Sequence, residues 1–307
     1  MAMDTIQKRL LREVADLHGI PEGAYNIRSD GKLAGRNTTA NIDIVTKEDK
    51  PGIDIIIKDN TVNQSVHIPV IIAETGIKDL VYNDFYVGEN CDVTIVAGCG
   101  ISNCGGQESR HDGIHCFHIG KNSKVKYIEK HYGEGTGTGG RVMNPTTEIE
   151  MAENSYMEME TTQIKGIDDT IRKTTGKLAD NATLEIHEKI MTHEKQRAET
   201  YFSVDLDGVD CSANVISRSV AKGDSVQVFS SMINGNNQCA GHTACDAIIM
   251  DNASVVAKPE LTANSVEASL IHEAAIGKIA GDQLIKLMTL GLTEEEAEEQ
   301  IVAGFLK

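Results

Sequence analysis

Short apolar runs alternate with polar residues along most of this chain, and helical spacing is confined to its two ends. Residues 2–18 make the first helical segment, because aliphatic side chains recur there every three or four positions. These side chains are Ile6, Leu10, Leu11, Val14 and Leu17. Gly19 and Pro21 then end the pattern. We therefore expect an N-terminal helical segment within residues 1–26.

The central region, residues 27–267, repeats one unit. An apolar residue is followed three positions later by Asn or Gly, and then by apolar residues three and five positions further on. Asn and Gly tolerate the left-handed conformation of a tight corner. The later alternation starts a strand with one face turned inward. Six copies are centred on Asn90, Asn122, Asn154, Asn181, Gly223 and Asn252, at intervals of 32, 32, 27, 42 and 29 residues.

A corner and a strand that recur about every 30 residues, without helices between them, favour a solenoid. One rung cannot bury its inner face alone, whereas stacked rungs share a continuous core. The fold class that we predict is therefore mainly β, a parallel β-helix. A β-sandwich is the competing interpretation, since its short strands and frequent turns give a similar pattern.

The C-terminal segment, residues 268–307, returns to helical spacing. Its first helix spans 281–290, with apolar Leu284, Ile285, Leu287 and Met288, and stops at Gly291. Residues 293–296 (TEEE) form a capping box that starts a second helix. We interpret the acidic stretch 294–299 as a solvated helix face.

Composition and charge limit the function classes. Aromatic residues make up only 4% of the 307 residues, so Val, Ile, Leu and Met must fill the core, as small stacked rungs allow. The net charge of −17 disfavours binding to nucleic acids or to anionic membranes, which requires a basic face. No stretch reaches the roughly 18 apolar residues of a membrane helix.

The N-terminal segment carries charges among its apolar positions, so it does not resemble a signal peptide. We therefore expect a cytoplasmic protein. In that reducing compartment, the seven cysteines are better interpreted as thiols or metal ligands than as disulfides.

The densest group of thiols and imidazoles lies between residues 99 and 118. It contains Cys99, Cys104, His111, His115, Cys116 and His118. Such side chains suit a soft or borderline metal. The spacing is not that of a zinc finger, and a strand over 113–119 would turn His115 away from Cys116 and His118. A turn-rich segment with incidental polar residues is the alternative.

A second group, CAGHTAC, contains Cys239, His242 and Cys245. Six residues of strand span about 20 Å, too far for two thiolates that each lie about 2.3 Å from one metal. Only a sharp corner, at Gly241, would bring both cysteines together. We therefore expect one of the two cysteines, and not both, to be a ligand.

Cys245 has partners at the spacing of one rung. Glu273 follows it by 28 residues and Cys211 precedes it by 34. Neighbouring rungs lie about 4.8 Å apart, so thiolate and carboxylate on one wall would form an iron site. His272 and Glu273 are adjacent, so only one of them can share the face of Cys245.

Phosphate-binding loops do not appear. The run GEGTGTGGR fits GxGxxG only formally, because Pro145 follows it and no helix does. No GxxxxGK[ST] motif occurs. Any use of ATP would therefore belong to a partner.

The closing run ASLIHEAAIGKIAGDQLIKLMTLGLTEEEAEEQIVAGFL (268–306) resembles the C-terminus of SufB and SufD proteins. HTACDAIIM (242–250) is similar to the family segment in which Cys-Asp opens a late strand of the β-helix. GKNSKVKYIEKHYGEG (120–135) and the following NPTTEIEMAENSYMEME also resemble this family. The resemblance covers roughly residues 85–307.

This resemblance implies a right-handed parallel β-helix with helical ends, and a scaffold that builds a transient iron–sulfur cluster at a subunit interface and passes it to apoproteins. It places the cluster cysteine at Cys245 and the ligating glutamate at Glu273, beside His272. Cys211, Cys239, His242 and Cys99 are lesser candidates. It also implies that residues of about 281–303 dock a SufC-type ATPase, and that the scaffold itself is not an enzyme.

The chain lacks the extended N-terminal region of longer SufB proteins, and Ile271 stands where another acid can occur. Its compact length resembles that of minimal two-component systems, so we expect a homodimer through the β-helix. The alternative is a SufD-like subunit that only organises the ATPase. A β-helix enzyme acting on carbohydrate or acyl groups is a third hypothesis, which the scarcity of aromatic residues disfavours.

Overall fold

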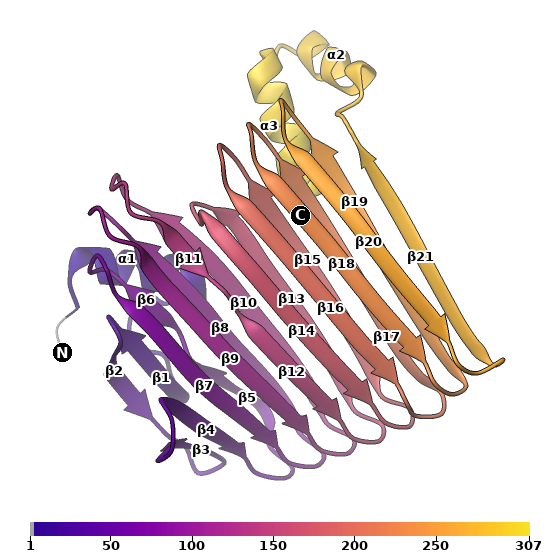
Figure 1. Ribbon diagram of the computed structural model, residues 1–307. Helices are drawn as coiled ribbons and strands as arrows, with labels where there is room; N and C mark the ends of the chain where they lie inside the picture. The colour runs from indigo at the N-terminus through magenta and orange to yellow at the C-terminus, as the bar shows by residue number, and fades with distance from the viewer. Residues whose placement is uncertain (1–2) are drawn as a thin grey trace.

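Two parallel sheets face each other along the molecule and wind into a β-solenoid of about 8 turns (Figure 1). The computed structural model describes residues 3–307. Each turn contributes one strand to each sheet, so neighbours within a sheet lie one turn apart in the sequence. The predicted parallel β-helix is confirmed, and the β-sandwich interpretation is wrong.

Sheet A runs from the N-terminal hairpin to the last strand of the chain. In spatial order it contains β2 (Lys32–Asn37), β1 (Ala24–Ser29), β5 (Val62–His67), β8 (Asp92–Ser102), β10 (Lys124–Glu134), β13 (Tyr156–Lys165), β15 (Thr183–Thr192), β17 (Cys211–Ala221), β19 (Cys239–Ile249) and β21 (Ala268–Gly277), with β6 (Val70–Ile72) beside β1 and β8.

Sheet B lies across the core from sheet A. In spatial order it contains β20 (Ser254–Ala263), β18 (Val226–Gly235), β16 (Arg197–Leu206), β14 (Asp169–Leu178), β11 (Arg141–Met143), β9 (Ser109–Ile119), β7 (Lys78–Val87), β4 (Gly52–Ile57) and β3 (Ile42–Thr46), with β12 (Thr146–Met151) between β9 and β14.

The corners explain the repeat in the sequence. Asn90, Asn122, Asn154 and Asn181 all adopt left-handed φ angles of 55–58° at the corners that enter sheet A. Their side chains also stack, since Asn122 Nδ2 donates to Asn90 Oδ1 at 3.2 Å and Asn154 Nδ2 donates to Asn122 Oδ1 at 3.2 Å.

The last two copies of the repeat belong to the opposite edge of the solenoid, where the chain enters sheet B. Gly223 is left-handed there, but in the sixth copy Asp251, and not Asn252, takes that conformation. Asp210 and Glu194 make further left-handed corners that the repeat pattern did not reveal. The irregular interval of 42 residues therefore reflects a switch from one edge to the other.

A helix covers part of the outer face of sheet A near the N-terminal end of the solenoid. Helix α1 (Thr5–Ala15) begins with a capping box between Asp4 and Gln7, and its Leu10 and Val14 are fully buried. The helix packs on the outer face of β8 at Gly98, where a Cβ atom would lie 2.2 Å from the Val14 carbonyl oxygen. Glycine is therefore required for this close approach.

The C-terminal end of the solenoid is open. Strand β21 pairs with β19 alone, so the β-helix continues to Gly277, beyond the boundary expected at residue 267. Helices α2 (Gly281–Thr289) and α3 (Glu294–Phe305) follow, and α3 starts with the predicted capping box between Thr293 and Glu296. None of the helices in residues 3–307 is long and apolar enough to cross a membrane.

Candidate metal centre

Strand β19 positions three of the candidate ligands. Its alternation turns Cys239 and Cys245 toward the interior and His242 toward the outer face of sheet A. All three lie in one uninterrupted strand, because no corner forms at Gly241. CAGHTAC is therefore not a chelating loop.

Cys245 is buried, with an exposed fraction of 1%. Its neighbours on the adjacent turns are Ser217 of β17 and Ala274 of β21. Burial raises the pKa of the Cys245 thiol to about 12, and the charge of Glu188 adds to this effect. The thiol is therefore protonated until a cation replaces its proton.

Two expected neighbours of Cys245 lie elsewhere. Cys211 pairs with Cys239, and both are buried in the aliphatic core. Glu273 pairs with Ala244 and not with Cys245. The sequence analysis placed Glu273 opposite Cys245 on the basis of a 28-residue spacing. That prediction is wrong, because one turn from β19 to β21 takes 29 residues, from Cys245 to Ala274.

Glu273 consequently points away from the core. Its side chain is 73% exposed on the outer face of sheet A, and its Oε2 lies 3.7 Å from His242 Nε2. The other ring nitrogen of His242 donates to Asn214 Oδ1 at 2.9 Å. This hydrogen bond orients the ring so that Nε2 faces Glu273.

His272 is the member of the His–Glu pair that shares the interior face with Cys245. It pairs with Thr243, the next inward residue along β19. Both of its ring nitrogens are buried and lack a hydrogen-bond partner among residues 3–307. Burial lowers the pKa of His272 and outweighs the opposing effect of the nearby Thr243 backbone, which keeps the imidazole neutral and able to bind a metal.

The group between residues 99 and 118 is divided by the fold. Cys99, His111 and His115 are buried inside the solenoid, whereas Cys116 and His118 point outward and Cys104 is exposed in a turn. Among residues 3–307, no cluster of three or more His, Cys, Asp or Glu side chains is arranged to hold a metal ion. Any centre in one chain therefore needs further donors.

Cys99 and His111 are electrostatically coupled. Burial opposes a charge on His111, but the Cys99 thiolate and the Asp79 carboxylate together raise its pKa to about 10. His111 Nδ1 lies 3.3 Å from Asp79 Oδ2. Burial alone would raise the pKa of Cys99, but His111 and His131 lower it to about 7. The pair favours a buried thiolate beside an imidazolium.

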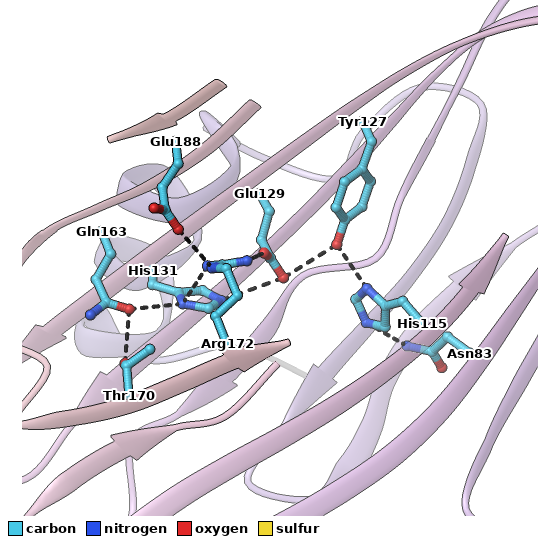
Figure 2. Close-up of polar contacts among 9 residues, drawn as sticks. All are labelled: Asn83, His115, Tyr127, Glu129, His131, Gln163, Thr170, Arg172 and Glu188. Carbon is cyan, nitrogen blue, oxygen red and sulfur yellow. Dashed lines mark hydrogen bonds and ion pairs between the residues drawn. The ribbon is translucent and has the colours of Figure 1, made fainter. Parts of the chain in front are cut away.

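A buried ionic network that the sequence analysis missed fills the middle of the solenoid (Figure 2). Arg172 of β14 is ion-paired with Glu129 of β10, and its Nε lies 3.7 Å from Glu188 of β15. Burial would raise the pKa of Glu129, but Arg172 holds it well below the usual range. Burial raises the pKa of Glu188 although Arg172 opposes it.

This network extends along the interior in both directions. Gln163 Oε1 accepts from Thr170 at 3.0 Å and contacts His131 at 3.2 Å, while Tyr127 contacts His115 at 2.7 Å. The sequence contained a pattern that indicates this network. Glu129 and His131 occupy the same alternate positions of the strand as the inward-facing Val125 and Tyr127.

The fold and the centre together define a parallel β-solenoid that carries a thiol and an imidazole on its interior face at one open end. Comparison with known proteins identifies the family to which this β-solenoid belongs. The SufBD core domain of the SUF system for FeS cluster assembly matches residues 82–305. The chain belongs to the SufB/SufD family.

Several relatives carry the same family description. An iron–sulfur cluster assembly SufBD family protein of Pyrococcus horikoshii is 28% identical over 287 residues, which cover 91% of this chain and 86% of the relative. One from Archaeoglobus fulgidus is 27% identical over 75% of this chain and 61% of its own length. One from Methanothermobacter thermautotrophicus is 29% identical over 77% of this chain and 57% of its own length. The chain thus matches less than two thirds of the latter two relatives.

Proposed function

We propose that this protein is a scaffold on which a nascent iron–sulfur cluster is assembled and from which it passes to apoproteins. The observation that carries the proposal is that Cys245 and the unpartnered His272 share one interior face, with His272 opposite Thr243 and Cys245 the next inward residue along β19, at the open end of a SufBD β-helix. Thiolate and imidazole are ligands of iron in protein clusters. Family membership supports a role in cluster assembly.

The proposed ligands are Cys245, His272 and Glu273. When iron binds, Cys245 loses its proton, because only the thiolate is a ligand. His272 presents a neutral ring nitrogen on the same side. Glu273 lies on the opposite, outer face of sheet A beside His242, so the sheet separates its carboxylate from the Cys245 thiol in the structure. Cys239 and Cys211 are weaker candidates, because they pair with each other and Cys239 faces Ala268, and not a histidine, on β21. Cys99 is also a weaker candidate. It lies in β8, far from β19 in sheet A, and its thiol is coupled to His111 there.

We propose that two copies pair through the β-helix. Strand β21 is the terminal strand of sheet A, so its outer edge carries unpaired backbone N–H and C=O groups. A second copy added at this edge would bring two candidate centres together and supply donors beyond those that residues 3–307 of one chain bring together. Mass measurement in solution tests the homodimer.

The partner that we propose is a SufC-type ATPase, which binds residues of about 281–303 and hydrolyses ATP, so that the scaffold itself catalyses no reaction. Helix α3 is anchored by the buried Ala297 and by Lys189, whose Nζ donates to the Lys307 carbonyl oxygen at 2.6 Å. Helix α2 instead exposes Ile285, Met288 and the adjacent Leu290. This apolar face suits a protein partner.

Anaerobic reconstitution with iron and sulfide tests the centre. The double variant Cys245→Ser with Glu273→Ala should lose the charge-transfer absorption of the cluster. If it binds cluster as well as the unaltered protein, the assignment of the centre fails.

Co-purification with the ATPase tests the partner. Ile285→Asp with Met288→Asp should abolish it, while Ile56→Asp on sheet B, with a comparably exposed apolar side chain, should not. The alternative function is a SufD-like subunit that organises the ATPase, and it predicts intact ATPase binding with no cluster on the isolated homodimer.

A further inference from the structure

A pocket of about 610 Å³ opens between helix α1 and the hairpin of β1 and β2. It lies at the end of the solenoid opposite the candidate metal centre (Figure 1). Helix α1 packs mainly on β8, β10 and β6, whereas the hairpin lies to one side of β8, beyond β5. A space therefore remains between the helix and the hairpin. Its volume is within the range of roughly 300–1,000 Å³ that small-molecule sites occupy.

The walls of this pocket are apolar. Leu11 of α1 and Ile27 of β1 are buried, and Leu17 and Tyr25 pack against the same cluster of side chains. Ile20, in the loop that follows the helix, also lines the pocket, and its side chain is 77% exposed. These side chains form a continuous apolar surface that is partly open to solvent, as in sites for small ligands.

The charged side chains that line this pocket are basic. Lys8, Arg9 and Arg12 extend from α1, and His18 follows in the loop. None of the lining residues is Asp or Glu, although the chain has 46 acidic and 29 basic residues. Arg9 is ion-paired with Glu134, whereas Lys8 has no ion-pair partner among residues 3–307. A local excess of positive charge in an acidic protein favours an anionic ligand.

The side chains that would recognise a nucleotide or a sugar are missing from the lining of this pocket. Carboxylates hold ribose hydroxyl groups, and Asn or Gln side chains read the edges of bases. None of the described residues that line the pocket is Asp, Glu, Asn or Gln. The body of the ligand should therefore be apolar, and its polar group should be an anion.

We propose that this pocket binds a free long-chain carboxylate, which is a fatty acid. Its acyl chain lies against Leu17, Tyr25 and Ile27, and its carboxylate lies beside Lys8 and Arg12. Burial of the methylene groups supplies affinity through the hydrophobic effect. Charge-assisted hydrogen bonds from the two cations select an anionic head group. This site is distant from Cys245 and His272, and it does not depend on the proposed function.

A free molecule is the ligand, and not a bilayer surface. The net charge of −17 opposes adhesion to anionic membranes, which bind clusters of basic residues. The apolar side chains line a concave pocket between two elements, and a single chain fits such a shape better than a flat surface does.

Displacement of a fluorescent carboxylate, dansyl-undecanoic acid, measures the affinity. Myristate and tetradecanol compete with it at concentrations below those at which they aggregate. The unaltered chain should bind myristate at one saturable site and should prefer it to the uncharged alcohol by roughly tenfold. Lys8→Gln with Arg12→Gln should remove this preference, while Lys177→Gln, an exposed lysine on sheet B, should retain it.

Two matched substitutions test the apolar part of the site. Ile20→Asp at the mouth of the pocket should weaken myristate binding by roughly tenfold. Val266→Asp, which also replaces an exposed aliphatic side chain but lies at the other end of the solenoid, should bind as the unaltered chain does. Ala34→Trp fills the pocket and should prevent binding of both competitors. If Ala34→Trp does not fold, Ile20→Asp and its control still decide.

Three results would overturn the proposal. One is equal affinity of the unaltered chain for myristate and tetradecanol. The second is unchanged myristate binding in Ile20→Asp and in the Lys8 and Arg12 double variant. The third is binding to phosphatidylglycerol vesicles without binding of free myristate, since a lipid surface would then be the ligand. None of these results bears on the cluster that is proposed at Cys245.

Discussion

Two interior regions of the solenoid differ in how their buried polar side chains are paired. In the middle, Arg172, Glu129 and Glu188 are each at most 2% exposed, and Arg172 is ion-paired with both carboxylates, although its Nε has no hydrogen-bond partner among residues 3–307. At the open C-terminal end, Cys245 and His272 share an interior face, and neither ring nitrogen of His272 has a partner among residues 3–307. Charges that are ion-paired in the interior stabilise a fold, whereas an imidazole in which neither ring nitrogen has a partner is available to a ligand.

The largest expected effect is on the middle region. Arg172→Met should lower the free energy of unfolding by about 3–5 kcal/mol, because it leaves Glu188 buried without a counter-charge and Glu129 with His131 alone. Urea denaturation measures it. Adding Glu129→Leu and Glu188→Leu should restore most of the loss. Arg110→Met, which breaks a partly exposed pair with Asp112, should cost at most about 1 kcal/mol.

A pH dependence should follow from His131 in the same region. Although burial opposes its charge, Glu129 raises its pKa to about 9 in the folded protein. Because the pKa of His131 is higher in the folded than in the unfolded chain, protonation of His131 stabilises the fold. This stabilisation is complete below the unfolded pKa of about 6.5 and is lost as the pH rises through about 9. The stability advantage of the unaltered chain over His131→Gln should therefore shrink by about 2–3 kcal/mol between pH 6 and pH 10. A constant advantage contradicts this account.

Replacing a histidine by leucine in each of the two regions tests the difference between them. His131→Leu should cost about 1–3 kcal/mol, because it leaves Glu129 and Gln163 short of a buried partner. His272→Leu should leave the free energy of unfolding unchanged or raise it by up to about 1 kcal/mol, while iron binding falls. Thermal unfolding and iron titration measure the two effects. Equal destabilisation at both sites would remove the distinction.

The smallest effect concerns the corners. Asn122→Ala should cost about 1 kcal/mol, because alanine is strained in the left-handed conformation at φ 57°. Asn252→Ala should cost at most about 0.5 kcal/mol, since Asp251 takes that conformation in its copy of the repeat. Chemical denaturation of both variants makes the comparison, and equal costs would show that the conformation is not what Asn122 supplies.

The sequence predicted the solenoid because its corners and strands are local. Asn at a tight corner and alternation over five residues are both visible in one rung. The register between rungs was not predictable in the same way. It depends on corner lengths that vary by one residue, and that one residue decides whether Ala274 or Glu273 faces Cys245.

The buried network is a second feature that local sequence patterns predict only in part. Glu129 lies in phase with inward Val125 and Tyr127, so its inward direction was visible in the alternation. Its partner Arg172 comes from a strand of the opposite sheet, 43 residues later. No local pattern links those two residues. Only the winding of the chain brings them together.

The most direct test of the account counts iron and sulfide per chain after anaerobic reconstitution of two matched variants. Cys245→Ser and Cys239→Ser each replace a buried, inward thiol of β19. Cys245 is the inward residue next to Thr243, the partner of His272 on β21, whereas Cys239 pairs with Cys211 on one side and Ala268 on the other. The account predicts that Cys245→Ser loses the cluster and that Cys239→Ser retains it. Equal cluster content in the two variants would contradict it.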